Sequence, residues 1–343
     1  MITKEKPMKM SESSGTHCAP LRMIYLVLLR GNSMIEFKHE PIMLRECIEN
    51  LHIKPDGIYV DGTMGGAGHS SEIVKQLSKD GLLIGIDRDK EALTASKKRL
   101  CDYENVKYVW GKHEDIKTHV NELGLEKVDG ILLDLGVSSY QIDEASRGFS
   151  YTKDAQLDMR MNKEQDLTAM QVVNTYQQSE LEKIFWEYGE DRFAKKIAGK
   201  MVKEREKKTI ETTYELADLI RSCVPNKTAV DSLKRIFQAL RIEVNGELKE
   251  LRKAIINSID ILNEGGRICI ITFHSLEDRI VKNTFIEMQG VCTCPKDFPK
   301  CVCGVVHHGK IITRKPIVPS QEEQEKNPRS KSAKLRVFEK GNI

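Results

Sequence analysis

A run of small and polar residues is the clearest candidate for a cofactor site in this chain. Residues 61–69 read Asp-Gly-Thr-Met-Gly-Gly-Ala-Gly-His and follow an apolar segment, residues 57–61, that is predicted to be a strand. Glycines in a turn after a strand let the backbone approach a ligand closely at the carboxyl edge of a parallel sheet. Dinucleotide-dependent enzymes and methyltransferases both use this position, so the glycines alone leave both classes open.

The spacing of the glycines separates the two classes. A dinucleotide fingerprint that uses Gly66 and Gly68 requires a third glycine at position 71, where this chain has Ser71. The loop therefore suits a methionine-bearing nucleoside better than a pyrophosphate, and S-adenosyl-L-methionine is the expected cofactor.

Two aspartates stand at the ends of later predicted strands. Asp87 ends residues 82–87, where its carboxylate can accept hydrogen bonds from both hydroxyls of a ribose. It could instead cap the next helix, but Asp89 is better placed for that cap. Asp134 ends residues 129–134, beside the position where ligands of open α/β sheets bind. A lone aspartate there would also fit a turn, but a polar loop follows it: Gly136, Ser138, Ser139 and Gln141.

Two histidines follow strands of the same predicted sheet. His113 lies just after residues 106–110 and could flank an adenine ring or lie in a surface turn. His274 follows residues 267–273 and could contact a substrate base or carry off a proton after transfer. The alternative for His274 is a core histidine that is bonded to the backbone.

The residues after His274 predict the start of a helix. Ser275-Leu-Glu-Asp278 has the spacing of a capping box. Ser275 and Asp278 are therefore expected to be structural, whereas Arg279 is expected to contact a phosphate.

The elements that must position these side chains alternate between strand and helix. Besides the strands above, helices are expected at residues 70–79, 90–100, 115–123 and 247–262, and late extended segments at 310–315 and 333–339. Strands that alternate with helices of this length predict an α/β fold with a parallel, doubly wound, Rossmann-like sheet.

The alternation stops in the middle of the chain. Residues 142–241 contain helical stretches such as 180–206 and 214–223, with no convincing buried strand. We therefore expect an all-helical insert at 142–241 within a discontinuous domain made of residues 34–141 and 242–343. Met34 offers a cleaner start than Met1, and residues 1–33 are expected to be a disordered extension.

Composition limits the class of protein. The 343 residues are 40% hydrophobic and carry a formal net charge of only +3, so any basic surface must be local, as in the Lys- and Arg-rich residues 310–340. No apolar run approaches the ~20 residues of a membrane span, and residues 23–29 lack a signal-cleavage site. A cytoplasmic protein without a membrane partner is expected.

Four of the nine cysteines cluster in one loop: Cys292, Cys294, Cys301 and Cys303. Four thiolates so close could hold a tetrahedral zinc ion, although the Cys-x-Cys spacing is tighter than that of the usual knuckle. The alternative is a reduced loop. Methyl transfer itself requires no metal.

Longer segments of the chain resemble the bacterial MraW/RsmH methyltransferase family. The likeness covers essentially everything after Met34. The matching segments are residues 38–42, 61–70, 85–89, 129–139, 143–149, 157–161, 188–192, 237–242, 244–245, 265–282 and 327–333.

The resemblance implies a class I S-adenosylmethionine-dependent methyltransferase that acts on N4 of a cytosine in the decoding centre of 16S rRNA. Its partner would be the small ribosomal subunit rather than DNA, and the helical insert would engage the RNA. The cofactor contacts implied are Ala67, Gly68, His69, Asp87, His113, Asp134 and Gln141. Members of the family usually have Phe where this chain has His113, whose flat imidazole can still stack on an adenine.

The lone pair of cytosine N4 is delocalised into the ring, so catalysis should come from positioning and from an acceptor for an N4 hydrogen. Asp134, or a backbone carbonyl of residues 136–139, is the expected acceptor, and His274 is a second candidate catalytic residue. RNA contacts are expected from Ser138, Arg147, Arg160, Arg241, Asn245 and Arg279. Any of these could instead be a surface ion-pair partner.

Two other functions remain open at this point. One is a nicotinamide-dependent oxidoreductase on the same fold, which Ser71 disfavours. The other is a non-catalytic factor that binds ribosomal RNA, which the polar loop around Asp134 disfavours.

Overall fold

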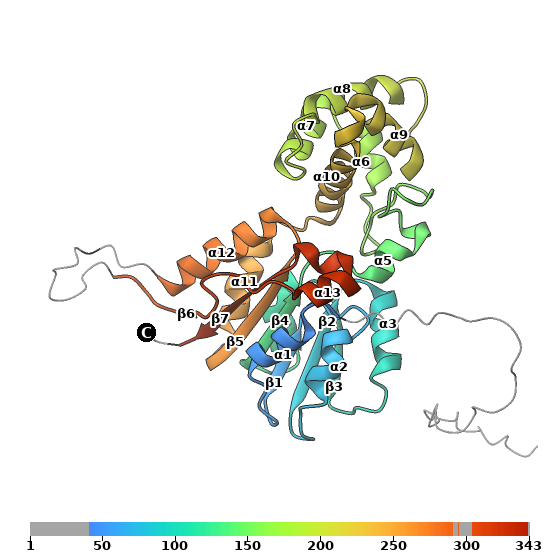
Figure 1. Cartoon of the computed structure of the whole chain (residues 1–343). Coiled ribbons are helices and arrows are strands. Elements are labelled where there is room, and N and C mark those ends of the chain that lie inside the picture. Colours follow the sequence, from blue (N-terminus) through green and yellow to red (C-terminus); the bar gives the residue numbers. More distant parts are fainter. Residues whose placement is uncertain (1–40, 291–293, 295–303, 342–343) are drawn as a thin grey trace, which may run out of the picture. The chain divides into compact units, whose positions relative to one another are not determined.

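The computed structural model describes residues 41–290, 294 and 304–341. In these residues a mixed sheet has the strand order β3-β2-β1-β4-β5-β7-β6 (Figure 1). The first five strands are parallel, and β7 and β6 join them antiparallel. The strands are β1 Ile58–Asp61, β2 Leu82–Asp87, β3 Val106–Trp110, β4 Val128–Asp134, β5 Leu262–Thr272, β6 Gly309–Ile311 and β7 Lys334–Lys340.

Successive residues of the central strands point to opposite faces of the sheet. In β4, Ile131 and Leu133 enter one hydrophobic cluster, whereas Leu132 between them enters another. All three are fully buried, as expected for parallel strands that are covered on both sides. The doubly wound, Rossmann-like sheet predicted from the sequence is confirmed.

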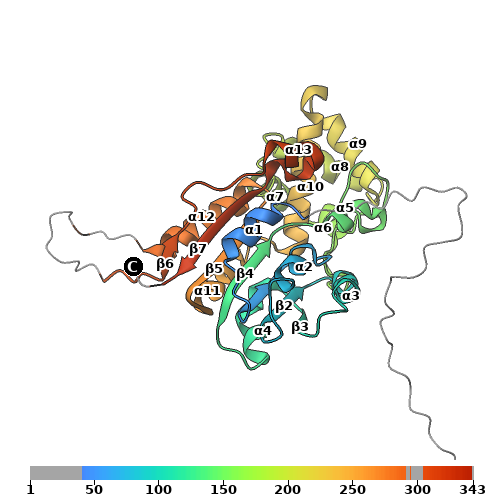
Figure 2. The ribbon, with the colours of Figure 1, turned by 60° about the horizontal axis from the view of Figure 1, so that its bottom comes forward.

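Helices cover the two faces, as Figures 1 and 2 allow the reader to follow. The apolar sides of α4 Ile116–Glu122, α11 Leu251–Asp260 and α12 Ser275–Gln289 pack on one face. Those of α1 Leu44–Leu51, α2 Gly68–Val74 and α3 Lys90–Arg99 pack on the other. The parallel order places the carboxyl ends of β1, β2 and β4 together, and this edge carries the candidate site.

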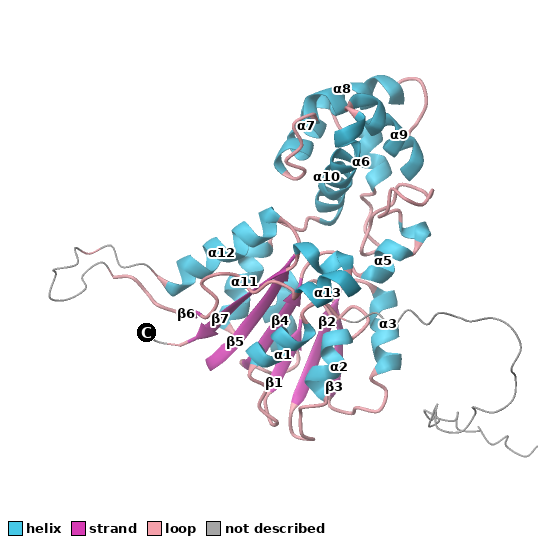
Figure 3. Ribbon diagram, in the orientation of Figure 1, coloured by secondary structure: helices cyan, strands magenta, loops and turns pink. Residues whose placement is uncertain are grey.

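A group of helices between β4 and β5 has its own core (Figure 3). The chain passes from β4 through α5 Ser139–Asp143 into it. The fully buried residues of this core run from Leu157 to Val244, and Phe149 and Tyr151 pack against it. Its helices are α6 Ala169–Thr175, α7 Gln178–Glu187, α8 Ala194–Arg205, α9 Thr213–Cys223 and α10 Asn226–Asn245, and the short α13 Gln321–Lys326 lies elsewhere. The regular elements that the structure describes between β4 and β5 are thus all helices.

The boundary expected at residues 241 and 242 is wrong. Helix α10 runs through it without a break and ends at Asn245, where Gly246 adopts a left-handed conformation with φ of 64°. Its buried positions recur every three or four residues, for example Leu233, Ile236 and Leu240, so the helix belongs to the core of the insert along its length.

Other local predictions need smaller corrections. The single helix expected at 180–206 is two helices, because Glu190 between them has φ of 47°, which a helix cannot contain. The helix expected up to residue 262 ends at Asp260, and β5 begins at Leu262 rather than at residue 267. The extended segment expected at 310–315 is the short β6.

Several expectations fall outside the described residues. These are the N-terminal extension at residues 1–33, the start at Met34, and three members of the cysteine cluster: Cys292, Cys301 and Cys303. Among the helices that are described, none combines the length and apolar character needed to cross a membrane.

Candidate active site

The glycine-rich loop after β1 is fixed against two neighbouring strands. The backbone N–H of Gly62 donates to the carbonyl of Leu132 in β4 at 2.9 Å, and that of Met64 donates to Ile86 in β2 at 3.0 Å. A Cβ at Gly62 would lie 2.5 Å from the side chain of Leu133, so only glycine fits there. Sequence and packing thus force this loop to lie over the carboxyl edge of the sheet.

Asp61, at the end of β1, is a buried acid inside this loop. Its carboxylate accepts a hydrogen bond of 2.6 Å from the Ser70 hydroxyl and one of 3.2 Å from the backbone N–H of Thr63. Burial raises the pKa of Asp61 to about 6, although these two hydrogen bonds oppose the shift. Its ionisation is therefore expected close to neutral pH.

Asp87, at the end of β2, joins the loop to the start of α3. One oxygen accepts from the backbone N–H of Gly65 at 2.7 Å and the other from that of Asp89 at 2.8 Å. Asp89 itself caps α3, because its side chain accepts from the N–H of Glu91. The division of labour expected for these two aspartates is confirmed as far as the cap is concerned. Since a carboxylate offers about four acceptor positions, Asp87 keeps about two for a ligand.

Asp134, at the end of β4, has one oxygen without a partner. Its backbone N–H donates to the Thr63 hydroxyl at 2.6 Å, which holds the strand end against the glycine-rich loop. Its Oδ1 atom is buried and has no hydrogen-bond partner among the described residues. Burial, together with the charges of Asp61 and Glu277, raises the pKa of Asp134 to about 8. Buried polar atoms normally have a hydrogen-bond partner, so the unpartnered Oδ1 is a candidate contact for a ligand.

His69 lies beside Asp134 in a fixed tautomer. Its Nε2 is 3.1 Å from the carbonyl oxygen of Ile42, which can only accept, so this nitrogen carries the hydrogen. The unprotonated Nδ1 then faces Oδ2 of Asp134 at 3.8 Å, which is too long for a direct hydrogen bond. Burial lowers the pKa of His69 to about 4. At neutral pH, therefore, the neighbour of Asp134 is a neutral imidazole and no counter-charge.

His113 is buried just after β3. Its Nε2 has no hydrogen-bond partner among the described residues. Burial lowers its pKa to about 4, against the opposing charge of Glu114. The Cβ of His113 would lie only 3.4 Å from a Cβ added at Gly62, which places the residue beside the loop. The alternative of an exposed turn histidine is excluded, and its contact with an adenine stays a prediction.

Gln141 and Ser138 form the start of α5. Ser138 accepts from the backbone N–H of Gln141, whose side-chain oxygen in turn accepts from the N–H of Ser138. The side-chain nitrogen of Gln141 donates to Asp89 at 2.9 Å. Gln141 is thus largely committed within the protein, and direct contacts of these two side chains with cofactor or RNA stay predictions.

His274 follows β5 and caps α12. The capping box lies one residue earlier than expected, on His274 and Glu277 rather than on Ser275 and Asp278. The backbone N–H of Glu277 donates to Nδ1 of His274, and the Glu277 carboxylate accepts from the N–H groups of Phe273 and His274. His274 takes the cap position because its Nδ1 accepts from the backbone N–H of Glu277, while the buried Glu277 carboxylate accepts from the backbone N–H of His274. Asp278 is structural, as expected, and pairs with Lys334 and Arg336.

The buried acids near His274 are already compensated. Glu247 forms a two-point ion pair with Arg241, with distances of 2.8 Å, and His274 Nε2 lies 3.2 Å from Glu277. Burial opposes ionisation of Glu277, but the adjacent His274 ring and the charge of Arg241 hold its pKa below the usual value. Ligand atoms of Glu247, His274 and Glu277 lie within 4.8 Å of one another. The two acids already accept hydrogen bonds, whereas the buried Nε2 of His274 has no hydrogen-bond partner among the described residues.

Known proteins identify the family. A model described as the MraW methylase family matches residues 36–341. The chain is 57% identical over 310 residues to a protein of Clostridioides difficile named ribosomal RNA small subunit methyltransferase H, covering 89% of this chain and all of that one. The chain belongs to the MraW methylase family.

Further relatives with the same name agree over the same span. One from Clostridium botulinum (strain Kyoto / Type A2) is 58% identical over 308 residues, which is 89% of this chain and all of that one. One from Lachnospira eligens is 56% identical over 311 residues, which is 90% of this chain and 99% of that one. As an MraW methylase, the chain is an S-adenosylmethionine-dependent methyltransferase with the class I, Rossmann-like fold. The oxidoreductase alternative is excluded.

The residues of this methylase fit the cofactor. A Cβ at Gly66 would meet nothing within 4 Å, so the loop leaves open space there. Around the loop are the free acceptor positions of Asp87 and the buried, unpartnered atoms Oδ1 of Asp134 and Nε2 of His113. Contacts by Ala67, Gly68 and His69, which lie in or just after the loop, remain predictions.

Two residues expected to contact RNA, Arg147 and Asn245, are instead buried in this methylase, and a third, Arg160, is partly exposed. Arg147 is only 2% exposed and donates to Asp89, Glu91 and the carbonyls of Arg160 and Met161. Asn245 is 5% exposed and bonds to the backbone of Met159 and Met161. All three guanidinium nitrogens of Arg160 bind within residues 158–165. The predictions for Arg147 and Asn245 are wrong, because these buried groups satisfy a tight turn whose Met159 has φ of 61°. An RNA contact by Arg160, whose side chain is 23% exposed, stays a prediction.

RNA contacts by Arg279 and Arg241 also stay predictions, although the guanidinium of Arg241 is already paired with Glu247. Arg279 is exposed and pairs with Glu190 at 3.2 Å. Such a surface pair exchanges easily for a phosphate.

Sequence reasoning placed Asp61 and Thr63 in the cofactor loop without giving either a role of its own, and it missed Glu247 and Glu277. For Asp61 a signal existed, since it ends a strand as Asp87 and Asp134 do. For Glu277 the spacing from His274 matched a capping box as well as the spacing that was chosen. The links from Thr63 to Asp134 and from Glu247 to Arg241 join residues with no local pattern, so only the folded chain could supply them.

Proposed function

We propose that this methylase transfers a methyl group to N4 of a cytosine in the decoding centre of the small-subunit ribosomal RNA. The observation that carries the chemistry is the buried, unpartnered Oδ1 of Asp134 at the carboxyl edge of the sheet. The RNA assignment draws on relatives that are 56–58% identical over nearly their whole length and are named for that substrate.

Asp134 would act as the acceptor for an N4 hydrogen. The amino nitrogen of cytosine needs its lone pair localised, and S-adenosylmethionine, when bound, supplies a methyl group that needs no activation. A carboxylate aligned with one N–H pulls the lone pair out of the ring and takes the proton as the new N–C bond forms. A pKa of about 8 suits this acceptor, because the proton it receives is held until the product leaves.

His69 and His274 would position the reaction. His69 presents a neutral, unprotonated Nδ1 to Asp134 at 3.8 Å, so it adds no positive charge that would weaken the base. His274 stands at the end of β5, next to β4, and its Nε2 is held near Glu277. We propose that His274 contacts the base from this side.

The target base must leave its stack to reach the methyl group. We propose that the helical insert and the loop after β4 hold the surrounding RNA, whose shape and 2′-hydroxyl groups are available for recognition. Arg241, Arg279 and Ser138 remain candidate contacts for this task. The expectation that the partner is the small ribosomal subunit belongs to the same proposal.

The test is a methyl-transfer assay on defined substrates. Labelled S-adenosylmethionine is offered to small subunits and to naked 16S rRNA from cells that lack the protein, and the modified nucleotide is mapped. Label on N4 of one decoding-centre cytosine supports the proposal. Label on another atom, another nucleotide or only on large-subunit RNA would contradict it. No transfer to any RNA, with cofactor bound, would favour the non-catalytic assembly factor.

A further inference from the structure

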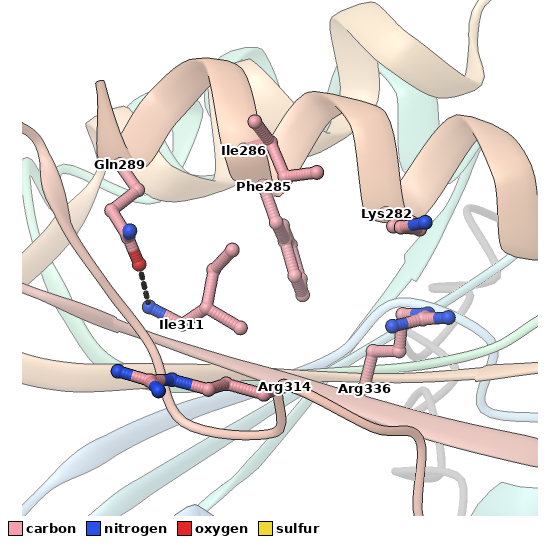
Figure 4. A pocket seen from close by; sticks show the side chains of 7 residues that line it. All are labelled: Lys282, Phe285, Ile286, Gln289, Ile311, Arg314 and Arg336. Carbon is pink, nitrogen blue, oxygen red and sulfur yellow. Dashed lines mark hydrogen bonds between the residues drawn. The ribbon is translucent and has the colours of Figure 1, made fainter. Parts of the chain in front are cut away.

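A small pocket lies on the far part of α12, away from the methyl-transfer site. It is lined by Lys282, Phe285, Ile286, Gln289, Ile311, Arg314 and Arg336, which we call the α12 pocket (Figure 4). Lys282 and Arg336 lie on one side of the Phe285 ring, and Arg314 and Gln289 on the other. Phe285 is only 1% exposed, so it forms a floor and does not offer a face for stacking.

The α12 pocket is lined by three cations and no carboxylate. Arg336 is paired with Asp278 at 2.5 Å. Lys282 and Arg314 are exposed, and neither has a hydrogen bond or ion pair among the described residues. With a formal net charge of only +3 on the whole chain, unpaired cations gathered around one hollow mark a local anion site.

The carboxylates near the pocket are already committed elsewhere. Asp278 binds Lys334 as well as Arg336. Glu287 pairs with Arg252, and Glu339 pairs with Arg267 and Lys310. None of these acids is therefore available to neutralise Lys282 and Arg314 without breaking another pair.

We propose that the α12 pocket binds a phosphate of the RNA backbone, outside the site of methyl transfer. The guanidinium of Arg314 can grip two phosphate oxygens and Lys282 can add a point charge from the opposite wall. Gln289 positions the wall that carries Arg314, because its side-chain oxygen accepts from the N–H of Ile311 at 2.9 Å. This inference rests on the proposed RNA substrate.

The distance along α12 fits a contact on the same RNA. Lys282 follows His274, the cap of the helix, by eight residues, which is ~12 Å at ~1.5 Å per residue. A stacked strand advances ~3.4 Å per phosphate, so the pocket would hold a phosphate about three or four nucleotides from the target base. Such a contact fixes register without reading sequence.

The test compares a Lys282→Glu/Arg314→Glu double variant with Lys107→Glu. Lys107 is exposed on β3, at the opposite edge of the sheet, and serves as the control for a charge reversal away from the pocket. Binding of a fluorescent small-subunit rRNA fragment is measured by anisotropy over a range of salt concentrations. The double variant should bind at least ~10-fold more weakly at low salt, and its slope of log affinity against log salt should be shallower by about 0.7–0.9, as for one lost phosphate contact. The control should match the wild type.

Other outcomes separate the sources of phosphate and the two proposals. Inorganic pyrophosphate is titrated in parallel, and a double variant that loses pyrophosphate binding but keeps wild-type RNA affinity and salt slope would overturn the proposal in favour of a free phosphate ligand. Unchanged binding of both probes would also overturn it. Because the binding assay needs no methyl transfer, its result stands apart from failure of the proposed reaction. If the double variant melts early, Lys282→Gln and Arg314→Gln are measured singly.

Discussion

At the scale of single residues, Asp134 is a buried acid with no compensating charge beside it. Asp134 shares its surroundings with Asp61 and Glu277, both of which raise its pKa, and the nearest imidazole, His69, is neutral at pH 7. The unpartnered Oδ1 makes Asp134 the member of this group with a free acceptor. Its protonation state should therefore control both activity and stability.

The rate of methyl transfer should rise with pH and level off above about 8. Below that pH most of Asp134 is protonated and cannot accept an N4 hydrogen. Asp134→Asn should lower the single-turnover rate by ~10²- to 10⁴-fold and remove the inflection. Rapid-quench measurements between pH 6 and 9.5 check this. Loss of S-adenosylhomocysteine affinity with an intact single-turnover rate would instead assign Asp134 to cofactor binding alone.

The same substitution should stabilise the protein in alkaline solution. Because the pKa of Asp134 is raised, the folded state binds more protons than the unfolded state between about pH 4 and 8, so the free energy of unfolding falls as pH rises through this window. Asp134→Asn removes that loss. At pH 9 we expect a gain of about 1–3 kcal/mol, reduced from the full ~1.4 kcal/mol per pKa unit because 29% of the side chain is exposed. Urea unfolding at pH 5 and pH 9 measures it, and an equal effect at both pH values would contradict it.

At this scale the sequence predicts the role of a residue correctly where that role depends on residues close to it in the chain. Asp89 was assigned to the cap of α3 because caps prefer that position, and this freed Asp87. The sequence predicts that Arg147 contacts RNA, because arginine suits phosphate. In the structure its guanidinium instead donates to Asp89, Glu91 and two carbonyls. These partners lie up to 58 residues away in the chain, and no local pattern could announce them.

At the scale of elements, α12 links the two ends of the proposed RNA path. Its cap, His274, stands at the active site, and the α12 pocket lies about two to four turns further along the same helix. Whether His274 acts only as the cap or also touches the substrate can be tested by exchanging it.

His274→Asn should preserve the helix, because asparagine is a good N-cap, whereas His274→Ala should cost about 0.5–2 kcal/mol of stability. If His274 contacts the base, both variants should lower kcat by at least ~10-fold. The measurements are thermal unfolding and steady-state kinetics on the same preparations. A His274→Asn variant with the wild-type kcat would leave His274 only its structural role.

Strands and sheet-packing helices were predictable because their apolar patterns are local and repetitive. Where the prediction failed, a backbone turn without an apolar signature decided the outcome. Glu190 breaks the long helix with a positive φ, and Gly246, not residue 242, ends the insert. The capping box moved to His274 because burial of Glu277 favoured it, and burial is a property of the fold.

At the scale of the whole molecule, Arg147 ties the sheet to the insert. It joins Asp89 and Glu91 at the start of α3 to the backbone of residues 160 and 161, which Asn245 holds to the end of α10. Arg147→Met should cost about 3–5 kcal/mol in urea unfolding, since it leaves the buried Asp89 without its cation and the carbonyls of residues 160 and 161 without a donor. Its salt slope for RNA binding should equal that of the wild type. A shallower slope, at unchanged stability, would restore Arg147 to the RNA interface.

The position of the insert also orders the folding of the chain. Strands β4 and β5 are hydrogen-bonded neighbours, yet the whole insert lies between them in the sequence. The core of the insert uses residues from Phe149 to Val244, so it can form while the rest of the chain is still being synthesised. The folded insert replaces a long flexible loop by a rigid connection between β4 and β5. This lowers the entropy that the two strands lose when they pair. The segment proposed to hold RNA thereby also helps β4 and β5 to pair during folding.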